Sequence, residues 1–63
     1  MMTKVYYISP ENQDYFFHVA DQLMMNFPCW MESQPVEMDW LEVTVKCRQE
    51  DIIAIEKAIA PYI

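Results

Sequence analysis

The sequence predicts a small α+β domain with elements in the order β-α-β-β-α. Three observations support this fold class. Val5–Ile8 is a run of β-branched and aromatic residues, as in a strand; residues 41–47 alternate between apolar and polar; and apolar residues recur at helical spacing after Pro10 and after Asp51. A chain of 63 residues is long enough for one domain only, so the domain comprises residues 1–63.

The first helix is expected to run from about Pro10 to about Asn26. Ser9 is a residue type that caps helix N-termini, proline suits the first helical position, and Glu11 favours the positive end of the helix dipole. Pro28 ends the helix, because the residue before a proline is driven out of helical geometry.

This helix has more apolar residues than a contact with one core requires. Nine of the thirteen residues from Tyr15 to Phe27 are apolar. At about 100° per residue, a central stripe for the core is formed by Phe16, Val19, Ala20, Leu23 and Phe27. Phe17 and Met24 lie on one flank of this stripe and Tyr15 on the other, which widens the apolar arc to about 200°, twice the width that a core contact needs. We interpret Phe17 and Met24 as part of a contact surface for a partner or for a second copy.

Two strands joined by a loose turn follow the helix. Between residues 41 and 47 the inward positions are apolar and the outward positions are polar. The segment that begins at Cys29 is a weaker strand, and Pro35 restricts it to a sheet edge. The turn lies between Pro35 and Asp39. Because the chain has no glycine, a tight two-residue turn with positive φ is not expected.

A second helix is expected to open with residues 48–51, which place acids in its first turn; Ile52, Ile55 and Ile59 follow at helical spacing, and Pro61 stops it. The order of elements predicts a three-stranded antiparallel sheet in the order 1-3-2 with both helices on one face, which is a truncated ferredoxin-like unit without its last strand. The first strand is then an exposed edge, which would be covered by pairing with a second copy or with a strand of a partner.

The charge of the chain excludes several classes of partner. Ten acidic residues against four basic ones give a net charge of −6. We therefore expect no direct binding to nucleic acid and none to an anionic membrane surface, since both require basic residues. The complementary partner is a larger protein with a basic groove. The alternative is that the acidity serves solubility alone.

A cytoplasmic location is predicted from two features of the sequence. No apolar stretch reaches the roughly 18 residues of a membrane span. The N-terminus turns polar after Ile8, too early for the apolar region of a signal peptide. In such a compartment the two cysteines stay reduced.

Four acidic residues around the predicted hairpin are candidate partner-binding residues: Glu32, Glu37, Asp39 and Glu42. One hypothesis is that they imitate the phosphate backbone of a nucleic acid and occupy a basic groove on a protein that handles DNA or RNA. The alternatives are an ordinary solvated edge, a pair of hydrolase carboxylates and a hard-cation site. Their spacing matches no known cation loop, and a hydrolase this small would lack a substrate cleft.

Aromatic residues of the same region are candidates for an apolar interface. Trp30 and Trp40, with Met31 and Met38, are expected to cluster around the hairpin, where tryptophan is a common interface anchor and methionine adapts to irregular contacts. The alternative is that they belong to the core. Tyr6, in the exposed first strand, is the remaining candidate for this interface.

His18 and the two cysteines are interpreted as structural or solvated residues. His18 lies on the polar face of the first helix, where a base or pH sensor is the alternative to a solvated side chain. Cys29 and Cys47 would face each other if the hairpin pivots near Met38, so a disulfide is the alternative to two reduced thiols. A zinc site of these three residues lacks a fourth ligand, and no metal or cofactor is predicted.

The predicted function is that of a small acidic protein-binding module that modulates or inhibits a larger partner, without enzymatic activity. In size and charge the chain is similar to compact acidic inhibitors of phages and mobile elements, such as anti-CRISPR and anti-restriction proteins, which act in the host cytoplasm; the similarity includes no shared motif. The alternatives are a structural domain that assembles as a homodimer through the first strand and first helix, and a small-molecule or metal-binding domain.

Overall fold

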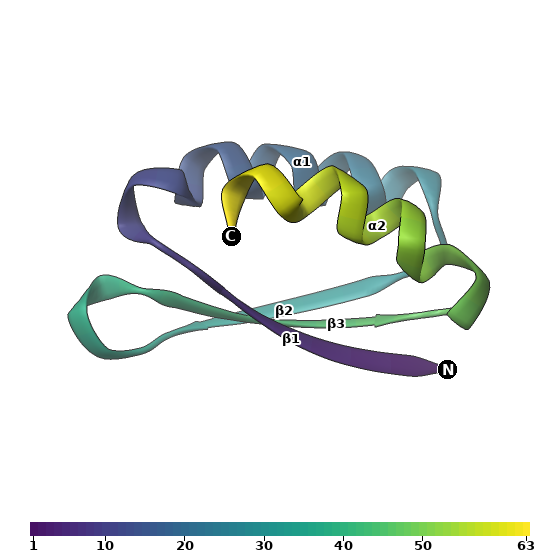
Figure 1. Cartoon of the computed structure of the whole chain (residues 1–63), viewed down its shortest axis with the longest axis horizontal. Coiled ribbons are helices and arrows are strands. Elements are labelled where there is room, and N and C mark those ends of the chain that lie inside the picture. Colours follow the sequence, from purple (N-terminus) through teal and green to yellow (C-terminus); the bar gives the residue numbers. More distant parts are fainter.

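The computed structural model describes all 63 residues and contains the five main elements in the predicted order. Strands β1 (Met2–Ile8), β2 (Trp30–Pro35) and β3 (Leu41–Cys47) form an antiparallel sheet in the order β1-β3-β2. Helices α1 (Gln13–Asn26) and α2 (Ile52–Ile59) lie side by side on one face of the sheet (Figure 1). The predicted element order and the predicted strand order 1-3-2 are confirmed.

The chain enters α1 through one turn of 3₁₀-helix, Pro10–Asn12, so the α-helix begins three residues later than expected. Ser9 acts through its backbone, because its carbonyl oxygen accepts a hydrogen bond from the Asn12 N–H at 3.0 Å while its side chain makes no capping bond. At the other end Phe27 is extended, with φ −129° and ψ 149°, as expected for the residue before a proline.

The turn between β2 and β3 is loose, as expected, but it contains positive φ at two residues that are not glycine. Met38 has φ 59° and Asp39 has φ 63°. Aspartate tolerates this left-handed region, whereas methionine is rarely found there. Three hydrogen bonds hold the turn: the Val36 N–H donates to the Trp40 carbonyl at 2.8 Å, the Trp40 N–H donates to the Glu37 carbonyl at 3.2 Å, and Gln13 Nε2 donates to the Asp39 carbonyl at 2.7 Å.

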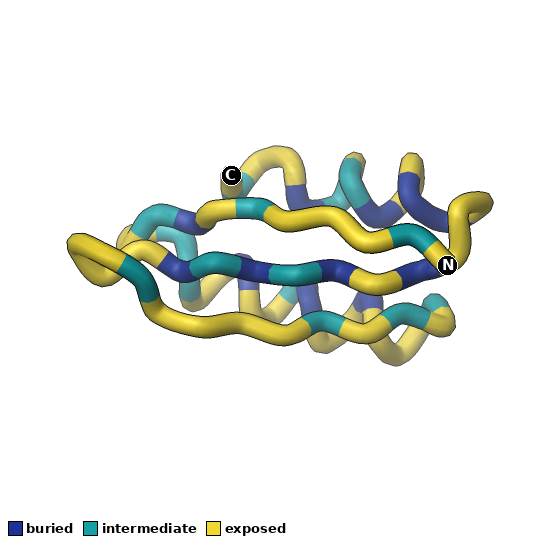
Figure 2. Tube along the Cα trace, turned by 90° about the horizontal axis from the view of Figure 1, so that it is seen from below, coloured by how far each residue is buried: buried dark blue, intermediate teal, exposed yellow.

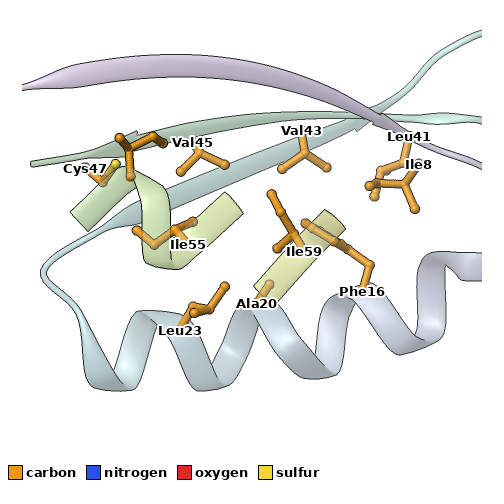
Figure 3. Close-up of a cluster of buried hydrophobic side chains, with 11 residues drawn as sticks. Ile8, Phe16, Ala20, Leu23, Leu41, Val43, Val45, Cys47, Ile55 and Ile59 are labelled. Atoms are coloured by element: carbon orange, nitrogen blue, oxygen red, sulfur yellow. The ribbon is translucent and has the colours of Figure 1, made fainter. Parts of the chain in front are cut away.

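The core lies between the sheet and the two helices (Figure 3). It contains eleven buried side chains: Ile8, Phe16, Ala20, Leu23, Leu41, Val43, Val45, Cys47, Ile52, Ile55 and Ile59. All four inward positions of β3 are among them, which confirms the alternation predicted for that strand. Val19 and Phe27, also expected in the core stripe, are only half-buried. The core thus uses a narrower part of α1 than the sequence suggested.

Candidate partner-binding surface

One face of the sheet has no helix on it (Figures 1 and 2). Strand alternation and register place nine side chains on this open face: Thr3, Val5, Tyr7, Trp30, Glu32, Gln34, Glu42, Thr44 and Lys46. Figure 2 shows β3 running between two outer strands that are mostly exposed. The open face therefore includes two of the four predicted acidic residues and one of the two tryptophans.

Hydrogen bonds fix both of these carboxylates. Glu42 accepts from the Tyr7 hydroxyl through Oε2 at 3.1 Å and from Gln34 Nε2 through Oε1 at 2.8 Å. The bond to Glu42 also raises the pKa of Tyr7, because it favours the protonated phenol. Glu32 Oε1 accepts from Trp30 Nε1 at 2.9 Å. The two negative charges are thus held in defined orientations on an exposed surface.

A polar hollow lies between these carboxylates. Its lining consists of Glu32, Ser33, Gln34, Glu42 and Thr44, with no hydrophobic side chain, and its volume is about 170 Å³. Sites for small organic ligands usually have about 300–1,000 Å³ and mostly apolar walls. The hollow is thus smaller and more polar than a usual site for a small organic ligand.

The other two predicted acidic residues lie outside this hollow. Glu37 and Asp39 belong to the short 3₁₀ turn beyond the ends of β2 and β3, and both are exposed. The structure therefore brings Glu32 and Glu42 together and places Glu37 and Asp39 at one end of the sheet (Figure 1).

The two tryptophans do not form the expected cluster with Met31 and Met38. Trp30, paired with Lys46, lies at the end of the hairpin far from the turn, whereas Trp40 is next to the turn. A strand rises about 3.3 Å per residue, so the two ends of the hairpin are well separated. Met31 is half-buried on the inward face and Met38 is exposed in the turn. Trp30 and Trp40 are both exposed and remain separate candidate contacts.

Tyr6 lies on the inward face of β1, which differs from the expected contact surface. Its side chain is half-buried, and its hydroxyl oxygen is buried without a hydrogen-bond partner. Burial, together with the nearby Glu56 carboxylate, raises the pKa of Tyr6 to about 12. The neighbours Val5 and Tyr7 are exposed on the open face instead. The alternation of β1, counted back from the buried Ile8, is the sequence signal that identifies them.

The two apolar flanks of α1 have different surroundings. On one flank the ring of Tyr15 stacks on that of Tyr62, with centroids 6.3 Å apart, so the C-terminal segment covers part of this side. On the other flank Phe17 and Met24 are 43% and 37% exposed and border the edge of β2 across a groove. The apolar surplus of α1 thus remains uncovered on the flank that faces β2.

The hydrogen-bond pattern shows which backbone groups are free at the sheet edges. The bond from Val36 to Trp40 marks a hydrogen-bonded pair of the β2–β3 register, and such pairs alternate along antiparallel strands. Backbone groups of β2 therefore turn outward at Met31 and Ser33. By the same alternation those of β1 turn outward at Thr3, Val5 and Tyr7. Both outer strands offer unpaired donors and acceptors.

His18 and the cysteines lie apart from the open face. His18 is exposed on α1 with Nε2 3.5 Å from Gln22 Nε2. Cys29 and Cys47 are each one residue beyond the Trp30–Lys46 pair, which is the pair of the β2–β3 register farthest from the turn. Both cysteines are free. Burial raises the pKa of both thiols. No group of three or more His, Cys, Asp or Glu side chains is placed to hold a metal ion. Neither helix has the length and apolar composition needed to cross a bilayer.

Comparison with known proteins does not assign the chain to a family. No protein-family model, no curated protein and no solved structure matches it. The open face, the free strand edges and the exposed flank of α1 are therefore the features from which a function is inferred.

Proposed function

We propose that this chain is a protein-binding module that modulates or inhibits a larger protein by presenting the paired carboxylates of its open face to a basic groove. The observation that carries the proposal is the fixed pair of carboxylates, Glu32 and Glu42, beside a hollow that no hydrophobic side chain lines. Side chains that are already oriented lose less conformational entropy on binding than mobile ones.

The distribution of charge supports the same proposal. Two of the four basic residues are engaged within the chain: Lys4 pairs with Glu56 at 3.3 Å, and Arg48 pairs with Glu50 and Asp51 at 3.3 and 2.8 Å. The excess negative charge speeds association with a positive surface. A protein that handles DNA or RNA has such a surface, and an inhibitor of the phage or mobile-element type would occupy it.

The test begins with capture of the tagged protein from its native cell lysate after nuclease treatment, and then measures the affinity of purified variants for the captured partner. The pair Glu32→Lys and Glu42→Lys changes the net charge from −6 to −2, two reversals of +2 each. We expect it to weaken binding roughly tenfold or more and to reduce the salt dependence.

The matched control is Glu11→Lys with Asp14→Lys, which makes the same change of charge at exposed positions in the 3₁₀ turn before α1 and in the first turn of α1. We expect this pair to leave affinity nearly unchanged. Binding that survives the open-face pair, or is weakened equally by both pairs, would contradict the proposal. A third pair, Glu37→Lys with Asp39→Lys, measures whether the turn belongs to the contact.

The free edge of β1 favours a second candidate function, a homodimeric structural domain. Antiparallel pairing of two copies about Val5 would join two three-stranded sheets into one. Val5→Pro removes an outward N–H without removing a bond to β3, so we expect it to abolish a dimer while the fold persists. Light scattering after size-exclusion chromatography measures this, and a wild-type chain that is monomeric at high concentration would exclude this candidate.

A further inference from the structure

An apolar groove lies between the exposed flank of α1 and the outer edge of β2. Side chains from both elements and from the core beneath form its apolar lining: Phe16, Phe17, Ala20, Met24, Met31 and Val43. Its volume is about 60 Å³, which is about the volume that two water molecules occupy in liquid water. This is far below a small-molecule site but matches one small aliphatic side chain.

A carboxylate lies on each face of the sheet beside this groove. Asp21 lines the groove from α1, and Glu32, the β2 residue between Met31 and Ser33, has its carboxylate on the open face. An occupant that places an apolar side chain in the groove therefore brings its neighbouring residues next to negative charge. Lysine or arginine at those neighbouring positions would be favoured, and acidic residues would be repelled.

The strand edge beside the groove has free backbone groups. The N–H and C=O groups of Met31 and Ser33 turn outward from the sheet, while their side chains point to the inward side, where the groove lies. An extended segment paired with β2 would use these groups for its main-chain hydrogen bonds. Every second side chain of that segment would then lie on the groove side of the sheet.

We propose that the groove between α1 and β2 binds an extended segment of the partner protein, which adds as a fourth strand to β2 and inserts one apolar side chain flanked by Lys or Arg. This rests on the proposed function, since it names the partner element that the chain recognises. A second copy is a poorer occupant, because each copy has a net charge of −6 and two of its four basic residues are already in ion pairs.

The test uses a phage-displayed library of random nine-residue peptides as the probe, selected on the immobilised full chain. We expect the enriched peptides to have an aliphatic residue with Lys or Arg close to it and to lack proline and acidic residues. In ¹⁵N spectra their binding is expected to shift the amide signals of Met24, Met31 and Ser33.

Three variants, each with a matched control, test the groove itself. Met24→Glu places a charge in the groove, and Met25→Glu places it one residue away on an exposed position. Asp21→Lys reverses a border charge, and Asp14→Lys is its control. Ser33→Pro removes a free N–H of β2, and Val5→Pro removes one of β1. We expect each groove variant to weaken peptide binding roughly tenfold and the controls to leave it unchanged.

Three outcomes would overturn the inference. The first is that no peptide is enriched, and the second is that peptide binding survives Met24→Glu. The third is that the chain self-associates and Met24→Glu abolishes the self-association, because a second copy would then be the occupant of the groove. The proposed function is tested separately by Glu42, which lies outside the groove. A partner whose binding is weakened by Glu42→Lys but not by Asp21→Lys or Met24→Glu would support the open-face function and refute the groove.

Discussion

Glu42 connects all three strands on the open face, because it belongs to β3 and accepts hydrogen bonds from Tyr7 of β1 and Gln34 of β2. A single carboxylate therefore determines how two neighbouring side chains are oriented. The bonds are exposed to solvent, so their role is to fix geometry rather than to provide much stability.

The pKa of Tyr7 reports on this contact. Its hydrogen bond to Glu42 holds the pKa above the usual value near 10. We expect Glu42→Leu to lower the pKa of Tyr7 back toward that value, as measured by NMR titration of the ring signals. Glu32→Leu is the control, since Glu32 bonds to Trp30 and should leave Tyr7 unaffected. A Tyr7 pKa that does not change in Glu42→Leu would contradict the bond.

Tyr6 has a buried hydroxyl without a partner, and this predicts a stabilising substitution. Tyr6→Phe removes the unpaired oxygen and keeps the ring, so we expect the free energy of unfolding to rise by about 1 kcal/mol. Urea denaturation measures it. Tyr7→Phe, which removes a bonded and exposed hydroxyl, should not stabilise the chain.

The raised pKa of Tyr6 also gives a pH dependence. The pKa is about 12 in the folded chain and near 10 in the unfolded chain, so folding favours the protonated phenol. This contribution is complete below pH 10 and is lost as the pH rises through about 12. Urea denaturation at pH 9 and pH 11 should therefore show a larger loss of stability in the wild type than in Tyr6→Phe.

At the scale of elements, the β2–β3 hairpin has an unfavourable turn at one end and two cysteines at the other. Met38 adopts a left-handed backbone that costs a residue with a Cβ atom about 1 kcal/mol. We expect Met38→Gly to raise the free energy of unfolding by about 0.5 kcal/mol, after the greater flexibility of glycine in the unfolded chain is subtracted. Asp39→Gly should stabilise less, because aspartate already tolerates positive φ.

At the other end of the hairpin, continuing the β2–β3 register by one residue beyond Trp30 and Lys46 would set Cys29 opposite Cys47, at a position without mutual backbone hydrogen bonds, where Cα atoms are typically about 4.5 Å apart. That spacing is within the range of disulfides. Oxidised glutathione is expected to convert both thiols to an intrachain disulfide by exchange, releasing two molecules of reduced glutathione. The reaction should be slow near pH 7, because burial raises the pKa of both thiols.

Intact mass spectrometry would show the loss of two hydrogen atoms, and urea denaturation a gain of about 3 kcal/mol from closing this loop. Cys29→Ser is the control and should give neither change. A mixed disulfide with glutathione that never resolves would show that the two sulfur atoms do not meet.

For the whole molecule, the fold was predictable because its signals are local. The alternation of Leu41–Cys47 and the helical spacing of Ile52, Ile55 and Ile59 each occur within a few residues, and they fix the elements and their inward faces. The site was less predictable because it depends on distant pairs. Tyr7 and Glu42 are 35 residues apart, and no local pattern indicates their bond.

The positions of Tyr6 and of the tryptophans illustrate the same limit. Tyr6 and Tyr7 are equally apolar neighbours, and only their distance from the buried Ile8 decides which one faces the helices. Trp30 and Trp40 are near each other in the sequence, yet they lie at opposite ends of the β2–β3 hairpin. The left-handed backbone at Met38 has no sequence signal, because the surrounding contacts impose it against the preference of the residue.

The excess of negative charge predicts how stability depends on salt. Self-repulsion at a net charge of −6 opposes folding and is screened as salt is added. We expect the free energy of unfolding to rise by a few tenths of a kcal/mol between about 0.01 and about 0.5 M NaCl. Glu37→Gln with Asp39→Asn should reduce this rise, and a decrease with salt would show that the ion pairs dominate instead.

Two open edges on one sheet also determine how copies would polymerise. Pairing β1 of one copy with β2 of the next is a head-to-tail contact, which would extend into a fibril if the rotation between copies does not close a ring. Each added copy lengthens the sheet by three strands, or about 14 Å, and adds a charge of −6. Since the Debye length at 0.1 M salt is about 10 Å, this repulsion opposes fibril growth strongly only in dilute buffer. In the cell, edge-to-edge growth would be prevented by whatever molecule covers an edge first.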